Sequence, residues 1–134
     1  MKHLNQTGKK VMDILTDGVT DYDQARKIKN NPCKSVMAVC VEKISNTKSG
    51  PLFSIAHYYE QCGDLMRDPD MTFLRGSDGN YYPLTYRQDN LGIDQDAIVW
   101  TDEGNIKGYH PKMQADMTSF ANGWMKNIKD QQRL

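Results

Sequence analysis

The residues best suited to chemistry are concentrated in one short stretch, HYYEQCGDLMRDPD, at positions 57–70. It contains three aspartates, a glutamate, a histidine, two tyrosines and a cysteine. Carboxylate oxygens bind Mg²⁺ and Ca²⁺, imidazole binds transition metals, and both groups can transfer protons. Three interpretations are therefore open: a metal or acid–base site, a recognition loop, and a polar turn between two strands.

Motif spacing argues against metal chemistry and nucleophilic catalysis. The acids Glu60, Asp64, Asp68 and Asp70 do not follow the D-x-[DN]-x-[DN]-G order of an EF-hand loop, and the chain has no H-E-x-x-H motif. It also lacks a G-x-S-x-G elbow, a phosphate-binding glycine loop and a dinucleotide fingerprint. We therefore predict no catalytic residue, no metal ligand and no cofactor. A small metal-dependent enzyme that uses the Asp-rich stretch is kept as an alternative.

A structural interpretation explains more of the same residues. Gly63 allows the positive φ that a turn can require, and Asp68, which precedes a proline, can accept backbone hydrogen bonds in an Asx-type turn. Asp64 is expected to pair with Arg67. His57 alternates with apolar residues along a strand and is expected to be a hydrogen-bonded residue of the core or its rim. The stretch is thus predicted to be a loop whose conformation is stabilised by its own residues.

The elements around this stretch begin with helical sequence. In TGKKVMDILTDG, apolar residues at 11, 14 and 15 follow one helix face, with Thr7 as the predicted N-cap and Gly18 as the stop. DYDQARKIKNNP predicts a second short helix that starts at Asp21, places residues 22, 25 and 28 on one face, and ends before Pro32.

The pattern from residue 35 onward is typical of strands. SVMAVCVEKI is rich in β-branched residues, and LFSIAHYY alternates between two faces. MTFLR and YYPLTYR are joined across GSDGN, a hairpin turn signal, and Pro83 requires an edge position or a bulge. A last hairpin is predicted in AIVWTDEGNIKGY, turning at residues 102–105.

The C-terminal segment predicts one long amphipathic helix that begins at Pro111. Its apolar stripe consists of Met113, Met117, Phe120, Ala121, Trp124, Met125 and Ile128. We expect this helix to cover one face of the sheet, with Phe120 and Trp124 buried. The predicted fold class is α+β: an antiparallel β-meander of four to six strands covered by the C-terminal helix, with two short N-terminal helices. Residues 1–134 form one domain in this prediction, divided into 1–31, 35–110 and 111–131.

A second polar stretch, YRQDNLGIDQD at positions 86–96, also separates predicted strands. Both stretches are interpreted as connections longer than a tight turn, where binding sites are often built. In a meander they follow strands separated by one antiparallel neighbour, so both emerge at the same end of the sheet. We therefore predict that they form one partner-binding face. Its predicted residues are Tyr59, Glu60, Asp64, Asp68, Tyr86, Arg87, Gln88, Asp89, Asp94 and Asp96.

Charge and composition restrict the class of protein. The formal charge is zero, yet residues 51–110 carry four basic residues against ten acidic ones, a charge of minus six. No apolar run could span a membrane and the lysine-bearing N-terminus lacks the apolar stretch of a signal peptide, so a cytoplasmic location is expected. Cys33, Cys40 and Cys62 show no C-x-x-C spacing and are expected to be free thiols, with Cys40 in the core. Direct nucleic-acid binding is disfavoured because no basic stripe interleaved with aromatic residues occurs.

Three runs carry a resemblance to a family: SIAHYYEQCGDLMRDPDMTF, YYPLTYRQDNLGIDQDAI and PKMQADMTSFANGWMKNIKDQQ. They resemble an uncharacterised family of small proteins encoded on bacterial plasmids, conjugative transposons and phages. The motifs are H-[YF]-Y-E-Q-x-G-D-L-M-x-D-P-[DE] and Y-x-x-D-x-x-G, and the resemblance spans about residues 52–132. It departs from the family at Cys62, where asparagine is expected, and at Asp94, where an aromatic residue is expected. The resemblance implies a mobile-element setting and carries over no activity.

The setting and the acidic central segment together suggest a function. We expect a non-catalytic protein-binding module, in its narrower form an anti-CRISPR or anti-restriction inhibitor whose acidic face substitutes for phosphate charge. The expected partner is then a host enzyme that processes nucleic acids. The alternatives are the metal-dependent nucleic-acid or nucleotide enzyme already named and a DNA-binding accessory factor that uses the basic N-terminal helices. The sequence does not distinguish among oligomeric states.

Overall fold

The protein is described by a computed structural model that covers residues 1–21 and 24–134. The helices are α1 (Gln6–Leu15), the 3-10 helix η1 (Asp89–Leu91) and α2 (Pro111–Gln132). The strands are β1 (Ala25–Ile28), β2 (Val39–Thr47), β3 (Gly50–Gln61), β4 (Asp64–Arg75), β5 (Tyr81–Gln88), β6 (Ile93–Asp96), β7 (Ile98–Trp100) and β8 (Ile106–Tyr109).

The main sheet is an antiparallel meander in which β1 to β6 follow one another in chain order. This confirms the predicted α+β class and the antiparallel sheet. The hairpin signal between β4 and β5 is confirmed by Asp78, whose carboxylate accepts hydrogen bonds from the Asn80 amide and the Tyr82 hydroxyl. These hydrogen bonds lower the pKa of Asp78 to about 2. Pro83 lies where the register of β4 and β5 shifts, as expected of a proline at a bulge.

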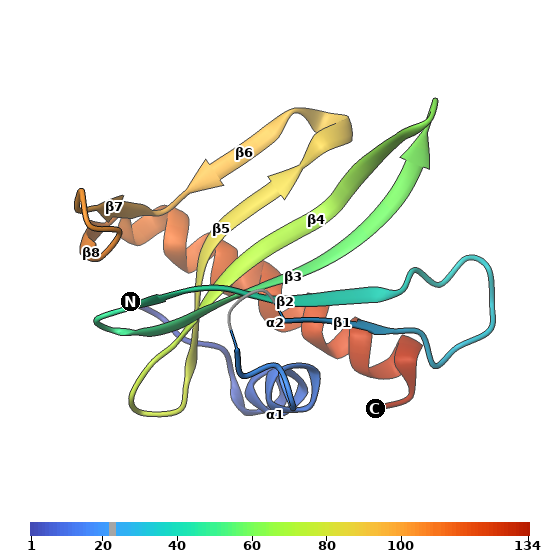
Figure 1. Ribbon diagram of the computed structural model, residues 1–134, viewed down its shortest axis with the longest axis horizontal. Helices are drawn as coiled ribbons and strands as arrows, with labels where there is room; N and C mark the ends of the chain where they lie inside the picture. Colours follow the sequence, from blue (N-terminus) through green and yellow to red (C-terminus); the bar gives the residue numbers. More distant parts are fainter. Residues whose placement is uncertain (22–23) are drawn as a thin grey trace.

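One face of the sheet is covered by α1 and α2 (Figure 1). The α2 helix begins at Pro111 as predicted, because proline lacks the amide hydrogen that the first helical turn leaves unpaired. Trp124 is 6% exposed and packs into the core with Met117 and Ile128. The predicted burial of Phe120 is wrong, since Phe120 is 43% exposed and meets Tyr86 edge-on at the margin of the sheet, with ring centroids 5.1 Å apart.

The second N-terminal helix is absent from the described residues. Ala25–Ile28 is instead the edge strand β1, which pairs with β2 from Ala25↔Glu42 to Ile28↔Val39. A helix as short as the predicted one is marginally stable on its own, whereas pairing of Ala25–Ile28 with β2 supplies hydrogen bonds and buries Ile28. Tyr22, which the predicted helix placed on its apolar face, lies outside the described residues. The one described N-terminal helix, α1, is capped by Asn5 rather than Thr7.

The stretch at 57–70 is not a loop but the outer part of the β3–β4 hairpin (Figure 1). The strands are joined by Cys62 and Gly63, with φ of 52° and 84°. Two consecutive positive φ values are typical of a type I′ turn, whose twist matches that of the strands it joins. The polar residues therefore continue the ladder, with Glu60↔Leu65 and Gln61↔Asp64 paired across it.

The connection between strands within residues 86–96 is also shorter than predicted. The β5 strand continues to Gln88, η1 makes the turn, and β6 pairs back from Gln88↔Ile93 to Thr85↔Asp96. Gly92 closes this turn with φ of 64°, and its amide donates to the Asp89 carbonyl oxygen. Both polar stretches are thus hairpin ends, and their side chains have positions fixed by strand geometry.

The other face of the sheet is partly covered by the β7–β8 hairpin, whose turn occurs where it was predicted. Leu52, Leu74, Leu84 and Ile98 form a small apolar cluster beneath it. Beyond this cluster the face is open, with Ser54 and Tyr58 on it. Alternation along β3 places Phe53, Ile55 and His57 on the opposite, helix-covered side, as the sequence predicted.

Candidate functional site

The two polar hairpin ends meet at one end of the sheet, joined by an ion pair between Arg67 of β4 and Asp89 of η1. Arg67 Nε lies 3.0 Å from Asp89 Oδ2, and Arg67 Nη2 lies 3.0 Å from Asp89 Oδ1. The Arg67 backbone amide also donates to Asp89 Oδ2 at 2.8 Å. These hydrogen bonds hold the pKa of Asp89 below its usual range and raise the pKa of Arg67. Bidentate geometry of this kind fixes the spacing of the two turns.

A second connection joins β5 to β4 on the helix-covered side. Gln88 Nε2 donates to Asp68 Oδ1 at 3.0 Å, and the Tyr86 hydroxyl donates to Gln88 Oε1 at 2.7 Å. Asp68 therefore does not close the Asx-type turn that the sequence predicted. It lies within β4 and accepts from the neighbouring hairpin. The donors of Gln88 have a structural use that sequence spacing alone did not indicate.

The acids of β6 are also engaged within the chain. Asp94 accepts from Arg87 Nε at 3.0 Å across the β5–β6 ladder. Asp96 accepts from the Ile98 amide at 2.9 Å and from Trp100 Nε1 at 2.8 Å. Much of the negative charge of the predicted face is thus compensated by arginine or by amide hydrogen bonds.

Glu60 and Asp64 differ from these acids. Within residues 1–21 and 24–134, neither carboxylate makes a hydrogen bond or an ion pair, and both residues are exposed. The predicted pairing of Asp64 with Arg67 is wrong, because residues three apart on a strand point to opposite faces. The free carboxylates of the face are therefore at the β3–β4 turn.

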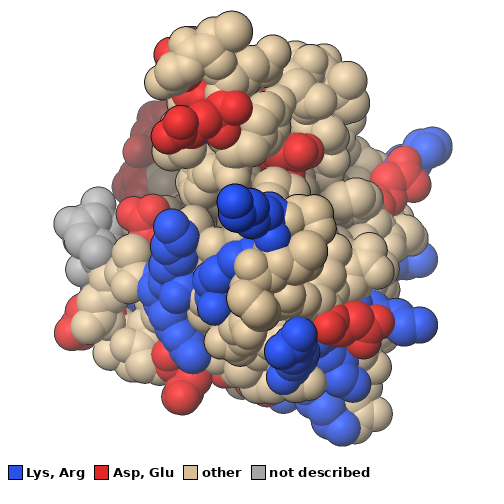
Figure 2. All heavy atoms as spheres, turned by 90° about the vertical axis from the view of Figure 1, so that its right-hand side faces the viewer, with Lys and Arg blue, Asp and Glu red and all other residues tan. Residues whose placement is uncertain are grey.

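Two exposed leucines accompany these acids and were not predicted. Leu65 is 64% exposed beside the β3–β4 turn, and Leu91 is 63% exposed in η1. The Arg67–Asp89 ion pair brings their two hairpin ends together. The only signal in the sequence is an isolated leucine within each polar stretch. Figure 2 shows acidic side chains on the upper part of this end of the molecule, with most Lys and Arg side chains below them.

We call this region the acidic end and define it by Tyr59, Glu60, Asp64, Leu65, Arg67, Asp68, Asp89 and Leu91. The structure brings the predicted residues Tyr86, Arg87 and Gln88 close to it through β5. Asp94 and Asp96 lie further along β6, toward the β7–β8 hairpin. The predicted face is therefore two neighbouring surfaces, the acidic end and the edge strand β6.

A polar hollow of about 270 Å³ lies on the open face of the sheet, next to the acidic end. Asp70 lines this hollow and accepts a hydrogen bond from Ser54 Oγ at 2.7 Å. Burial raises the pKa of Asp70, against the opposing effects of that hydrogen bond and of the nearby Arg67 and Arg87. Burial and the Asp70 charge likewise raise the pKa of Tyr58. Ser54 and Tyr58 carry no signal in the sequence that marks them as site residues, since both alternate with apolar residues in a pattern typical of any strand.

His57 lies on the opposite side of the sheet from this hollow. It is buried, and its Nδ1 donates to the Ala38 carbonyl oxygen at 2.9 Å. Its ring meets Trp124 edge-on with centroids 5.5 Å apart, and burial lowers its pKa. This confirms the predicted hydrogen-bonded core histidine. His57 and Asp70 therefore do not share a site, and no three His, Cys, Asp or Glu side chains of the described chain are grouped as metal ligands would be.

The cysteines are free thiols in the described chain, as predicted. Cys33 and Cys62 are exposed, while Cys40 is only partly buried and faces the open side of β2 rather than the core. A hydrogen bond with Ser35 lowers the pKa of Cys33, whereas burial raises the pKa of Cys40.

Comparison with protein families identifies a relationship along almost the whole chain, over residues 7–134. The chain belongs to the DUF6908 family, a domain of unknown function. The DUF6908 match includes α1 and β1, which the resemblance noted from the sequence did not cover. No curated protein and no solved structure matches the chain. No helix among the described residues of this DUF6908 domain is long and apolar enough to cross a membrane.

Proposed function

We propose that this DUF6908 chain is a non-catalytic protein-binding module that contacts its partner through the acidic end. The observation that carries this proposal is the pair of exposed leucines, Leu65 and Leu91, on two hairpin ends joined by the Arg67–Asp89 ion pair. A single exposed leucine is common on protein surfaces, but two on neighbouring hairpin ends offer apolar anchors to a partner.

The carboxylates around these leucines favour a basic partner. Glu60 and Asp64 are exposed and unpaired within the described chain, so a Lys or Arg of the partner can approach them without displacing an internal ion pair. Charges at the rim of an interface mainly accelerate association and exclude partners of like charge. The leucines would then supply contact area and the acids would supply orientation.

The narrower form of the proposal is an anti-defence inhibitor, active against CRISPR or restriction enzymes. Its support is the resemblance to proteins of plasmids, conjugative transposons and phages, together with the charge of minus six over residues 51–110. Enzymes that process nucleic acids have basic channels for phosphate groups, and an acidic protein surface can occupy such a channel. The partner in this form is a host defence enzyme.

The experiment begins with tagged protein purified from its host, and the proteins recovered with it are identified by mass spectrometry. Association with the recovered partner is then measured for Glu60→Lys/Asp64→Lys and for Leu65→Ser/Leu91→Ser. Asp102→Lys/Glu103→Lys is the matched control, because it changes the charge equally at the exposed β7–β8 turn. Asp89 and Asp96 are left unchanged, because both carboxylates accept backbone hydrogen bonds within the chain and their reversal would disturb the local structure.

The charge reversal should slow association by about tenfold at low salt, as expected for rim charges that steer a partner. The leucine pair should instead accelerate dissociation, because it removes buried contact area. The control should leave both rates unchanged. Partner binding that is indifferent to both acidic-end variants, with melting temperatures unchanged, would exclude this end as the contact.

A further inference from the structure

The β6 strand is the outer edge of the six-stranded sheet. In the part of the chain that the structure describes, β6 pairs with β5 on one side and with no strand on the other. Asp94, Gln95 and Asp96 are all exposed. An edge strand presents backbone N–H and C=O groups that can hydrogen-bond to a further strand.

The chain itself occupies only part of the space beside the outer edge of β6. The His110 amide donates to the Ala97 carbonyl oxygen at 2.8 Å, so the end of β8 lies along the outer side of the chain just after β6. Ile98↔Tyr109 pairing continues that arrangement in the β7–β8 sheet. At Pro111 the chain turns into α2, and the place beside Gln95 and Asp96 is left open.

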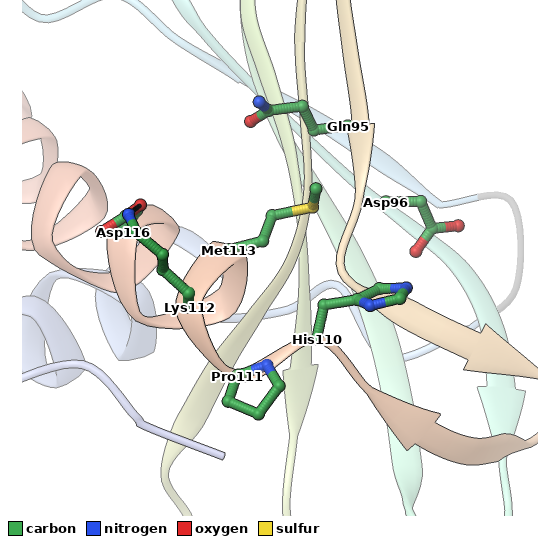
Figure 3. Close-up of a pocket in the computed structure, with 7 residues that line it drawn as sticks. All are labelled: Gln95, Asp96, His110, Pro111, Lys112, Met113 and Asp116. Atoms are coloured by element: carbon green, nitrogen blue, oxygen red, sulfur yellow. Dashed lines mark hydrogen bonds and ion pairs between the residues drawn. The ribbon is translucent and has the colours of Figure 1, made fainter.

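A hollow of about 520 Å³ occupies the place that the chain leaves open. Its walls are the exposed edge of β6 and the first turn of α2. In Figure 3 the Gln95 and Asp96 side chains leave β6 in opposite directions, and Met113 extends from α2 toward the strand. The hollow thus lies on the helix side of the edge, beside Gln95, whereas Asp94 lies on the open face with Arg87.

We propose that β6 accepts an extended segment of a protein partner as a seventh strand, with basic residues at alternate positions. Backbone groups of that segment would pair with the outer edge of β6. Side chains on one face would lie beside Asp94 and Asp96, and the side chains between them would enter the hollow beside Gln95 and Met113. This inference rests on the proposed protein-binding function and specifies that the partner is bound by strand pairing at β6.

The negative charge of β6 favours a basic segment as the added strand. The Asp94 side chain is 67% exposed, and Arg87 Nε occupies only one of its oxygens in the described chain. Cross-strand pairs of opposite charge stabilise a sheet, while like charges directly opposite destabilise it. A second copy of β6 would bring its own aspartates to this edge, so a basic segment of another protein fits better than a dimer of this chain.

The test uses a probe peptide of six residues that alternates lysine with valine, acetylated and amidated at its ends. Binding to the isotope-labelled full chain is followed by NMR, with amide exchange measured for β6. Three control peptides are used. One has glutamate in place of lysine, one is N-methylated on the lysine amides, and one is N-methylated on the valine amides, so that the two N-methylated peptides cover both sets of alternate residues. Asp94→Lys is compared with Asp102→Lys, which changes the charge equally at a distant exposed turn.

The lysine peptide should bind with a Kd between about 10 µM and 1 mM, a range typical of a short segment that must be ordered on binding. Outward-facing amides of β6 should become protected from exchange. N-methylation of one of the two sets should weaken binding by about tenfold or more, since it removes main-chain donors. Asp94→Lys should weaken it similarly and Asp102→Lys should not.

Absence of binding at about 5 mM peptide, well above the expected Kd, would overturn the strand-addition proposal. So would binding that leaves the β6 amides unprotected or that tolerates N-methylation of either set. These outcomes are distinguishable from failure of the proposed function. If Glu60→Lys/Asp64→Lys abolishes partner binding while Asp94→Lys does not, the protein-binding function stands and strand addition at β6 is wrong.

Discussion

Cys62 shows how one residue can occupy a conformation that its type disfavours. It is the first residue of the two-residue β3–β4 turn and has φ of 52°, in the left-handed region. Side chains with a branched or bulky Cβ are disfavoured there, whereas asparagine and glycine are tolerated. The resemblance noted from the sequence leads one to expect asparagine at this position, and the turn geometry gives the physical reason for that preference.

We predict that Cys62→Asn stabilises the protein by about 1 kcal/mol, because asparagine followed by Gly63 is the preferred pair for this turn type. Cys62→Val should destabilise it by a similar amount, since a β-branched residue is strained at positive φ. The free energy of unfolding is measured by urea denaturation under reducing conditions. Cys33→Asn, another exposed cysteine outside the left-handed region, should change little.

His57 makes stability depend on pH. Burial lowers the pKa of His57 from its ordinary value of 6.5, so the unfolded chain binds a proton more readily than the folded chain does. Stability contributed by neutral His57 is therefore present above about pH 6.5 and is lost as pH falls from there toward the lowered pKa. Asp70 acts in the opposite direction at lower pH, because burial raises its pKa above 3.8.

We predict that His57→Asn flattens the decline in stability as the pH falls below about 6.5. The asparagine amide can still donate to the Ala38 carbonyl oxygen, while the titrating ring is gone. At pH 7.5 the variant should be less stable by about 1–3 kcal/mol, because the edge contact with Trp124 is lost. Urea denaturation across the pH series is the measurement, and a parallel decline in both proteins would contradict the assignment. Asp70 is unchanged in the variant and its contribution cancels.

At the scale of elements, α2 is a lid whose residues contribute unequally. Trp124 and Phe120 belong to the same predicted stripe, yet one is buried and the other covers only the sheet margin. The difference arises because Phe120 packs edge-on against Tyr86 of β5, whereas Trp124 packs against His57 of β3 within the core. A helical stripe specifies which side faces the sheet but not where the sheet ends.

We predict that Trp124→Ala destabilises the protein by about 3–5 kcal/mol, as expected when a buried aromatic ring is removed. Phe120→Ala should cost only about 1 kcal/mol, since the lost interaction is a partly exposed aromatic pair. Urea denaturation of the two variants makes the comparison. Equal effects would mean that the two rings are buried to the same extent, contrary to their 6% and 43% exposure.

The sequence predicted those elements whose local pattern agrees with their tertiary setting. The meander, the turn at Asp78, the bulge at Pro83 and the start of α2 all have local chemical causes. The β1 strand was missed because its apolar residues also fit a helix face, and only β2, far along the chain, decides between the two. The outer β3–β4 hairpin was missed because its many polar residues are typical of a loop, whereas the turn itself consists of Cys62 and Gly63 alone.

The structure brings only some residues of the predicted face together, for a similar reason. Chain order and antiparallel pairing were enough to predict that both hairpin ends lie together. The ion pair between Arg67 and Asp89 joins them in the structure. Sequence could not show which carboxylates are engaged by partners elsewhere in the chain. Asp89 and Asp94 pair with arginines and Asp96 accepts neutral hydrogen bonds, whereas Glu60 and Asp64 have no such partner among the described residues.

At the scale of the whole molecule, the formal charge is zero, but acidic and basic residues are unevenly distributed along the chain. Acidic residues gather where the β3–β4 and β5–β6 hairpins end, and most basic residues of the same view lie below them (Figure 2). A protein with such an arrangement is oriented by the field of a charged partner before contact. The acidic end also projects beyond the rest of the sheet (Figure 1), so its geometry depends on few interactions.

We predict that Arg67→Gln loosens this projecting end while leaving the rest of the molecule folded. The substitution removes the ion pair that joins β4 to η1, but no apolar core contact. Amide exchange should accelerate in the outer β3–β4 hairpin and in η1, and amides of α2 and of the central strands should keep their protection, because such local openings are separate from global unfolding. Hydrogen exchange measured residue by residue is the test.

Arg87→Gln provides the matched control, because it breaks the exposed Arg87–Asp94 pair and leaves the Arg67–Asp89 ion pair in place. Exchange in the β3–β4 hairpin should then be unchanged. If Arg67→Gln also weakens binding of the partner recovered with the tagged protein, the spacing of Leu65 and Leu91 must be fixed for recognition, since the variant retains both leucines. Equal acceleration by the two variants would mean that loss of an arginine charge, rather than loss of the Arg67–Asp89 ion pair, loosens the acidic end.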